Sequence, residues 1–177
     1  MQLETERLVL RLPQLDDAEA FLDFVGDPEV MRPIGSEPGG IEVAVEHVER
    51  WIRRWEADDL GTFVVLRKGD ELVLGRVGPI VWNSRIWETS TLSDAADDAQ
   101  VELGWAIARE HWGSGYATEA ARAVRRWIYD DRGVQHLISL IAAENKRSQR
   151  VASKLGARPV ETVQTPGGPA TIWVHPR

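Results

Sequence analysis

Hydrophobic residues recur along the chain with two different periods. Alternation over residues 8–12 is typical of a strand, whereas spacing of three and four over residues 45–55 is typical of one face of a helix. The same criteria predict main strands at 8–12, 62–67, 71–82, 101–108 and 134–142, two short strands around 166–169, and helices at 16–25, 45–60, 117–131 and 148–155. Strands and helices therefore alternate, which indicates a mixed α/β domain.

Local signals sharpen some of these elements. Asp16 followed by Glu19 predicts a capping box at the first helix. Lys68-Gly69-Asp70 separates two β-rich runs, which predicts a hairpin. Residues 83–99 form a long polar connection, and such connections are either functional or merely mobile.

The 177 residues predict one domain, residues 1–177, because the chain has neither internal repeats nor a long linker. There is no apolar run of the ~20 residues that a membrane span needs. The first residues also lack the apolar core of a signal peptide. The chain has no cysteine, which excludes disulfides and thiolate chemistry. We therefore expect a cytoplasmic protein with no membrane partner.

The net charge is −7, from 21 Lys and Arg against 28 Asp and Glu. Nucleic-acid binders usually carry a basic surplus, so this balance argues against a nucleic-acid partner. It mildly favours a cationic small molecule or peptide, or it merely keeps the protein soluble. The four histidines are scattered without paired ligand spacing, so we expect no metal site, and we expect His47 to be exposed.

The run after the strand at 101–108 contains Gly113 and Gly115, just before a predicted helix. Unpaired N–H groups and the helix dipole at such a place favour an anion such as pyrophosphate. The alternative is a tight turn that needs glycine only for its dihedral angles. A P-loop motif is absent. A dinucleotide fold lacks its third glycine, and too few residues follow Gly113 for a doubly wound sheet.

Four blocks of sequence occur together in one order: Glu4–Arg11, Glu102–Trp105, Trp112–Ala120, and Asn145–Ser148 with Lys154–Gly156. With these blocks the chain resembles the GNAT superfamily of acyl-CoA-dependent N-acyltransferases. Within it, the chain is similar to the RimJ/RimL-like branch, which acetylates protein N-termini. The resemblance covers nearly the whole chain.

The resemblance implies a strongly bent mixed sheet of about seven strands, splayed between its fourth and fifth strands and flanked by about four helices. It implies acetyl-CoA as co-substrate. The pantetheine arm would lie in the split and pair with backbone near Trp105, and the pyrophosphate would rest on backbone N–H groups from His111 to Thr118. Asn145 would hydrogen-bond the active-site end of the cofactor. The cofactor-side residues are thus Trp105, Ala106, Ile107, His111, Trp112, Gly113, Ser114, Gly115, Tyr116, Ala117, Thr118, Asn145 and Ser148.

The expected reaction is direct acetyl transfer to a primary amine in a ternary complex. Glu102 is the candidate general base. The alternative interpretation is that Glu102 is an ordinary exposed strand residue without a catalytic role. Many family members use a tyrosine as proton donor, but Ala152 stands at that position. The RimL-like pattern instead has a serine three residues after the asparagine, here Ser148, as proton donor to the sulfur. The alternative role for Ser148 is the N-cap of the short helix. Asn145 completes the predicted catalytic set.

The acceptor stays open between a peptide N-terminus and a small cationic amine. The acidic residues of the long connection could bind such a cation or form a solvated loop: Glu88, Asp94, Asp97 and Asp98. A homodimer is compatible with the family. The alternative function is a catalytically silent acyl-CoA-binding regulatory module, which the missing tyrosine keeps open.

Overall fold

The computed structural model describes residues 1–177, and its centre is one sheet of nine strands. Eight strands follow the order β1-β2-β3-β4-β6-β7-β9-β8, and β5 pairs with β4. The strands are β1 (Gln2–Glu4), β2 (Leu8–Arg11), β3 (Phe63–Arg67), β4 (Val73–Asn83), β5 (Glu88–Thr89), β6 (Ala99–Ile107), β7 (Leu137–Ile141), β8 (Arg158–Thr165) and β9 (Gly168–Val174). All neighbours pair antiparallel except β6 and β7, which are parallel.

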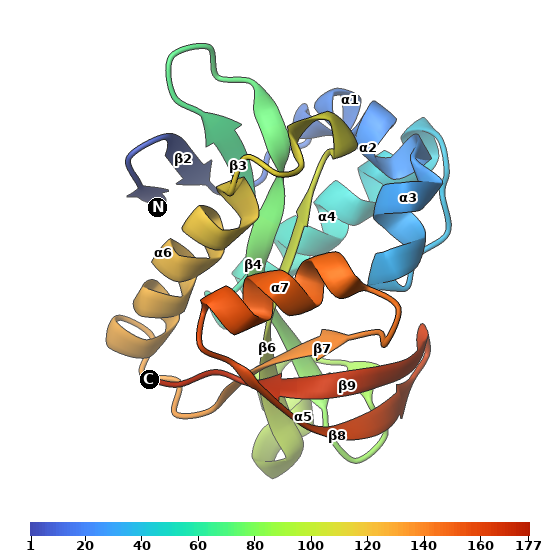
Figure 1. Cartoon of the computed structure of the whole chain (residues 1–177), viewed down its shortest axis with the longest axis vertical. Helices are drawn as coiled ribbons and strands as arrows, with labels where there is room; N and C mark the ends of the chain where they lie inside the picture. The colour runs from blue at the N-terminus through green and yellow to red at the C-terminus, as the bar shows by residue number, and fades with distance from the viewer.

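Helices cover both faces of the sheet (Figure 1). They are α1 (Asp17–Ala20), α2 (Leu22–Gly26), α3 (Pro28–Met31), α4 (Ile41–Asp58), α5 (Leu92–Ala95), α6 (Tyr116–Asp130) and α7 (Lys146–Lys154), with short 3₁₀ turns η1 (Arg32–Ile34), η2 (Ala96–Asp98) and η3 (Arg109–His111). One apolar core joins α6 and α7 to the sheet, and a second joins α1 to α4 to its other face. The sheet is therefore the middle of three layers.

The main elements expected from the hydrophobic pattern are confirmed, including the β3–β4 hairpin. The sheet has nine strands rather than about seven, because β1 and β5 are only three and two residues long and carry little periodic signal. The expected fold class, a mixed α/β sheet with helices on both faces, is confirmed.

The first predicted helix is wrong in its details. It is broken at Phe21 into α1 and α2, and the side chain of Asp16 makes no capping hydrogen bond. Asp17 instead accepts from Gln14 N at 2.7 Å and pairs with the guanidinium of Arg11. The carboxylate of Asp17, next in sequence, thus accepts a hydrogen bond from the loop before the helix, and the capping box does not form.

The sheet splays between β6 and β7, the fourth and fifth strands of the sequence prediction, as expected. These strands pair only at Val101 with Leu137 and at Glu102 with Ile138. Beyond Glu102, β6 continues to Ile107 while paired on its other edge with β4. The remaining edge of β6 is therefore not covered by β7. No helix in the chain is both long enough and apolar enough to cross a membrane.

Candidate active site

Two cavities meet where the sheet splays. The larger has a volume of about 540 Å³ and lies on the α4 side, and the smaller has about 210 Å³ and lies beside α6 and α7. Five residues line both cavities: Pro33, Ile34, Trp105, Asn145 and Ser148. The strand β6, the start of α7 and the turn η1 therefore form the boundary between them.

The smaller cavity is lined by the glycine loop and the start of α6. Of the predicted cofactor-side residues, all but Ser114 line it. None of the backbone N–H groups from Gly113 to Thr118 donates to another backbone group. Those of His111 and Trp112 are used locally, for Ala108 O and Arg109 O. The unpaired donors thus run from Gly113 onwards, later than the sequence suggested, and unpaired N–H groups at a helix N-terminus attract anions.

The two loop glycines are required by their backbone angles. Gly113 has φ of 80° and Gly115 has φ of 85°. A Cβ at Gly113 would meet no atom within 4 Å. The local reason for glycine is therefore the left-handed conformation.

The N-terminal block of the sequence holds this loop in place. Glu119, in the first turn of α6, accepts from Thr5 Oγ1 at 2.6 Å and from Arg7 Nε at 2.7 Å. Arg7 also donates to Ser114 O at 3.1 Å and lies over the ring of Tyr116. Two sequence blocks that lie more than 100 residues apart are thus in direct contact. Ser114 takes part in this contact through its carbonyl oxygen and does not line the cavity.

The uncovered edge of β6 offers backbone groups to the split. The Ser139 hydroxyl donates to Leu103 O at 2.6 Å, and Trp112 Nε1 donates to Ile107 O at 2.7 Å. Alternate residues of a strand direct their backbone groups to the same edge. Trp105 lies midway between Leu103 and Ile107 on β6, so its N–H and C=O also point toward the split between β6 and β7. Ala106 lines the cavity, but its backbone faces β4, where it pairs with Arg76.

At the start of α7, Asn145 is the N-cap: its Oδ1 accepts from Ser148 N at 3.0 Å, and its Nδ2 donates to Pro33 O at 3.0 Å. Ser148 is therefore not the cap, which corrects the alternative stated above. Its hydroxyl lies at the junction of the two cavities. Ala152 is fully buried in the core and lines neither cavity.

Sequence reasoning missed the basic wall of the smaller cavity. Arg147, Arg150 and Lys154 of α7 line it, and the guanidinium of Arg147 lies 3.7 Å from the centroid of the Trp112 ring. Their spacing of three and four residues places them on one helix face, a pattern that could have been recognised. These charges suit the same anion as the unpaired N–H groups.

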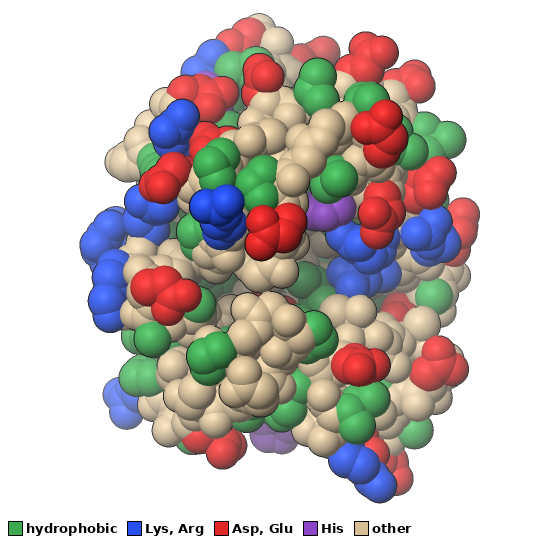
Figure 2. All heavy atoms as spheres, turned by 90° about the vertical axis from the view of Figure 1, so that its right-hand side faces the viewer, with side chains coloured by type: hydrophobic (Ala, Val, Ile, Leu, Met, Phe, Trp, Pro, Cys, Tyr) green, Lys and Arg blue, Asp and Glu red, His purple; other side chains and the backbone are tan.

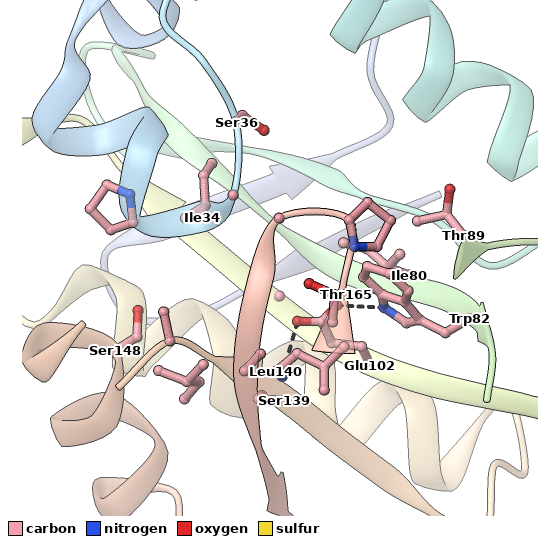
Figure 3. A pocket seen from close by; sticks show the side chains of 18 of the residues that line it. Ile34, Ser36, Ile80, Trp82, Thr89, Glu102, Ser139, Leu140, Ser148 and Thr165 are labelled. Atoms are coloured by element: carbon pink, nitrogen blue, oxygen red, sulfur yellow. Dashed lines mark hydrogen bonds between the residues drawn. The ribbon is translucent and has the colours of Figure 1, made fainter. Parts of the chain in front are cut away.

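Glu102 lies in the larger cavity with only 7% of its surface exposed, so it is not an ordinary exposed strand residue. Trp82 Nε1 donates to one carboxylate oxygen at 2.7 Å, and Leu140 N donates to the other at 3.2 Å (Figure 3). Burial raises the pKa of Glu102, although these two hydrogen bonds oppose the shift. A carboxylate with a raised pKa is suited to taking a proton near neutral pH.

Basic side chains gather in the same cavity. His47, Arg50 and Arg54 of α4 and Arg76 of β4 line it. His47 is 8% exposed, so the expectation of an exposed histidine is wrong; burial and then the neighbouring arginines lower its pKa to about 4. Its helix turns this residue toward the sheet, whereas Val45 is exposed. Figure 2 shows a hollow on this face with a histidine and a group of basic side chains at its edge.

The acidic connection contributes little to the cavity. Of its four candidate residues only Glu88 lines it, and Asp98 instead pairs with Arg85 at 2.9 Å. The cavity is closed on the far side by the β8–β9 turn. There a Cβ on Gly167 would lie 3.0 Å from the Cα of Gly35, so the two backbones touch. No group of three or more side chains is placed to hold a metal ion.

A splayed sheet, with unpaired N–H groups of a glycine loop at one end of the split and a buried carboxylate at the other, fits an acyltransferase. A family model described as an acetyltransferase (GNAT) domain matches residues 7–158. The chain belongs to this family of acetyltransferases.

Individual relatives agree with the family. The chain is 38% identical over 173 residues to the Bacillus subtilis protein named "Uncharacterized protein YkkB", covering 97% of this chain and 94% of the relative. It is 25% identical over 158 residues to "Uncharacterized N-acetyltransferase YnaD" of the same organism, covering 89% and 83%. The crystal structure of an acetyltransferase from Agrobacterium tumefaciens superposes with a TM-score of 0.79 at 23% identity, covering 100% and 95%, which shows the same fold.

Proposed function

We propose that the protein moves an acetyl group from acetyl-CoA directly to a primary amine, with both substrates bound at once. The observation that carries the proposal is the run of unpaired N–H groups from Gly113 to Thr118 beside the uncovered edge of β6. Acetyl-CoA supplies the activated acetyl group when it binds. An amide-bearing arm could pair with the edge of β6 as an added strand would.

The chain would bind this co-substrate through three kinds of group. The N–H groups of the glycine loop face its pyrophosphate, the side chains of Arg147, Arg150 and Lys154 add positive charge, and the backbone of Trp105 offers hydrogen bonds in the split. A backbone N–H of β6 would polarise the acyl carbonyl. Asn145 would keep the wall in place by capping α7 and holding η1.

In the transfer itself, the amine nitrogen forms a C–N bond as the C–S bond breaks. Glu102 takes one proton from the ammonium group, directly or through water, so that the nitrogen is neutral when it attacks. The second proton, which the nitrogen loses as the amide forms, passes to the leaving thiolate through the hydroxyl of Ser148, which regains the proton it donates. The two residues are placed suitably, since Glu102 lies in the larger cavity and Ser148 lies at its junction with the smaller one. Binding two substrates from opposite sides explains why the site is divided into two cavities.

The RimJ/RimL-like assignment rests on the four sequence blocks, and with the cytoplasmic location and the homodimer it stays a prediction. The alternative function is a silent acyl-CoA-binding module. It is favoured by one specific observation, namely that alanine replaces the family tyrosine at position 152. Buried Glu102 and the free hydroxyl of Ser148 favour the enzyme.

The test is amine-dependent release of the CoA thiol, followed with a thiol reagent across a panel of primary amines. The proposal expects release that depends on the amine and that falls in Glu102→Gln. Binding of acetyl-CoA with no release for any amine would support the silent module and reject the enzyme.

A further inference from the structure

The larger cavity is basic, although the protein as a whole carries a net charge of −7. His47, Arg50 and Arg54 are spaced by three and four residues, so they share one face of α4. Arg76 approaches from β4, and its neighbours in the cavity are these α4 residues and Glu102. Three guanidinium groups thus converge from two elements onto one side of the cavity, against the two carboxylates of Glu88 and Glu102.

Two of these guanidinium groups have no hydrogen-bonded or ion-paired partner in the protein. Arg50 pairs with Glu46 at 3.2 Å, but Arg54 pairs with no carboxylate. Arg76 Nη1 is buried and has no hydrogen-bond partner. Glu102 attracts both guanidinium groups through space, but its oxygens accept from Trp82 and Leu140 and form no hydrogen bond or ion pair with either arginine. Burial lowers the pKa of both Arg54 and Arg76 to about 10, which reflects the cost of desolvating these charges.

The strand beneath leaves room for these groups. Gly104 of β6 lies on the same face as Glu102, and a Cβ there would meet Arg76 Nη1 at 3.3 Å and Ile80 Cδ1 at 3.4 Å. The residue on the other side of Gly104 along this face is Ala106, which is also small. A side chain at position 104 would therefore crowd the Arg76 guanidinium, and glycine leaves that space free.

We propose that the amine acceptor is a small molecule that also carries an acidic group, a carboxylate or a phosphate, and that Arg54 and Arg76 bind this group. The inference rests on the proposed function, whose acceptor class it specifies. Guanidinium groups bind carboxylate and phosphate through paired hydrogen bonds. The acceptor's ammonium group then faces Glu102 and its acid faces the arginines, so one molecule matches both signs of charge in the cavity. Spermidine and other polycations match only one of them.

The experiment compares kcat/KM for paired acceptors that differ only in the acidic group. One arm sets the protein amino acids that carry a primary amine against their amides, and the other sets O-phosphoethanolamine against ethanolamine. Spermidine and a peptide with a neutral N-terminal residue complete the panel. We expect at least one acid-bearing amine to exceed its neutral partner by tenfold or more. The arm in which this occurs identifies the anion as carboxylate or phosphate.

The variants are Arg76→Met, which keeps a long side chain and removes the charge, and Arg54→Met at the less buried position. The preference is the ratio of kcat/KM for the acid-bearing acceptor to kcat/KM for its neutral partner. We expect this ratio to fall toward one in each variant and to be partly restored in Arg76→Lys. The matched control is Arg53→Met on the exposed side of α4, which pairs only with Glu49 and should keep the preference. If Arg76→Met does not fold, Arg54→Met decides.

Failures of the two proposals are distinguishable. Transfer to spermidine or the peptide in preference to every acid-bearing amine would overturn the acidic-acceptor inference and leave the acetyltransferase standing. If no amine releases thiol, the enzyme proposal fails, and calorimetry with the same amino acids and amides in the presence of CoA decides the anion site. Equal affinity for an amino acid and its amide, or an affinity for the amino acid that is unchanged in Arg54→Met, would overturn the inference of an acid-binding site.

Discussion

The two cavities are built in different ways. The smaller one takes its binding groups mostly from consecutive backbone, Gly113 to Thr118, fixed by two positive φ angles. The larger one takes its groups from side chains on α4, β4 and β6, such as Arg54, Arg76 and Glu102, which lie far apart in sequence. A backbone site tolerates changes in most side chains, whereas a side-chain site changes its ligand with each substitution. The smaller cavity therefore fits a fixed co-substrate, and the larger one fits an acceptor particular to this chain.

The largest expected effect is on the side-chain cavity, in Glu102→Gln. The amide keeps the shape of the carboxylate but cannot take a proton, so kcat should fall by roughly 10²–10⁴-fold while the affinity for acetyl-CoA is kept. The wild-type rate should rise with pH, because the base must be deprotonated. Since burial raises the pKa of Glu102, that rise should centre above the ordinary carboxyl value.

The control for this change is Glu88→Gln, which removes a carboxylate from the exposed rim of the same cavity. Its kcat should stay within about twofold of wild type, with the same pH profile. An equal loss in both variants would mean that the cavity needs negative charge in general and not a base at position 102.

A smaller effect is expected at the junction of the cavities, in Ser148→Ala. Loss of the hydroxyl should lower kcat by about ten- to a hundredfold, with little change in stability because Asn145 caps the helix. Ser153→Ala on the same helix removes a hydroxyl that bonds only Gln149 O, and it should leave kcat unchanged. A wild-type rate in Ser148→Ala would remove this residue from the chemistry.

The backbone cavity is tested by Gly113→Ala against Gly69→Ala. Both glycines have positive φ, 80° and 98°, and at neither position would an added Cβ meet another atom within 4 Å. Each substitution should cost about 1–2 kcal/mol of stability. Only Gly113→Ala should also raise the Kd for acetyl-CoA, by about tenfold, as measured by calorimetry. A similar Kd in the two variants would show that the loop does not hold the co-substrate.

The smallest effect concerns the buried histidine of the larger cavity. The pKa of His47 is lowered to about 4, so between pH 6.5 and 4 the unfolded chain binds a proton that the folded chain excludes. Stability should therefore rise with pH across this window, by at most ~1.4 kcal/mol per pH unit for this residue. Chemical denaturation should show a shallower slope in His47→Gln than in wild type.

His136→Gln, at an exposed position, is the control and should leave that slope unchanged. His175 contributes in the same direction, since burial lowers its pKa to about 4 as well, so the slope in His47→Gln is reduced and not abolished. An unchanged slope in His47→Gln would mean that His47 is not buried in a neutral form.

The contrast between a cavity built from consecutive backbone and one built from distant side chains also explains what the sequence could predict. The strands and the glycine loop follow from local periodicity and from a contiguous motif, and the splay was implied by the resemblance to the family, so all three could be predicted. The basic cavity could not, because the apolar spacing puts the buried stripe of α4 through Val45, which is exposed, and puts His47 outside it. A helix whose apolar residues extend more than halfway round leaves its buried face ambiguous, and only tertiary packing decides it.

Side-chain contacts between residues on different elements likewise could not be predicted from the sequence. Nothing in one sequence pairs Trp82 with Glu102, which are 20 residues apart and meet through strand register. Similarly, the link between Thr5 and Glu119 joins two motifs whose contact no spacing reveals. The overall net charge also does not describe the larger cavity, which is lined by Arg50, Arg54 and Arg76 but by only two acidic residues, Glu88 and Glu102.

The central claim, that the glycine loop and the open edge of β6 bind acetyl-CoA, is tested most directly by thermal unfolding with and without this ligand. At about a hundred times its Kd, the ligand should add roughly 2.7 kcal/mol, which raises the midpoint by about 5–10 °C for a domain of this size. The rise should persist in Arg76→Met and shrink in Gly113→Ala at the same ligand concentration. No rise with acetyl-CoA, or an equal rise with NAD, would contradict the account.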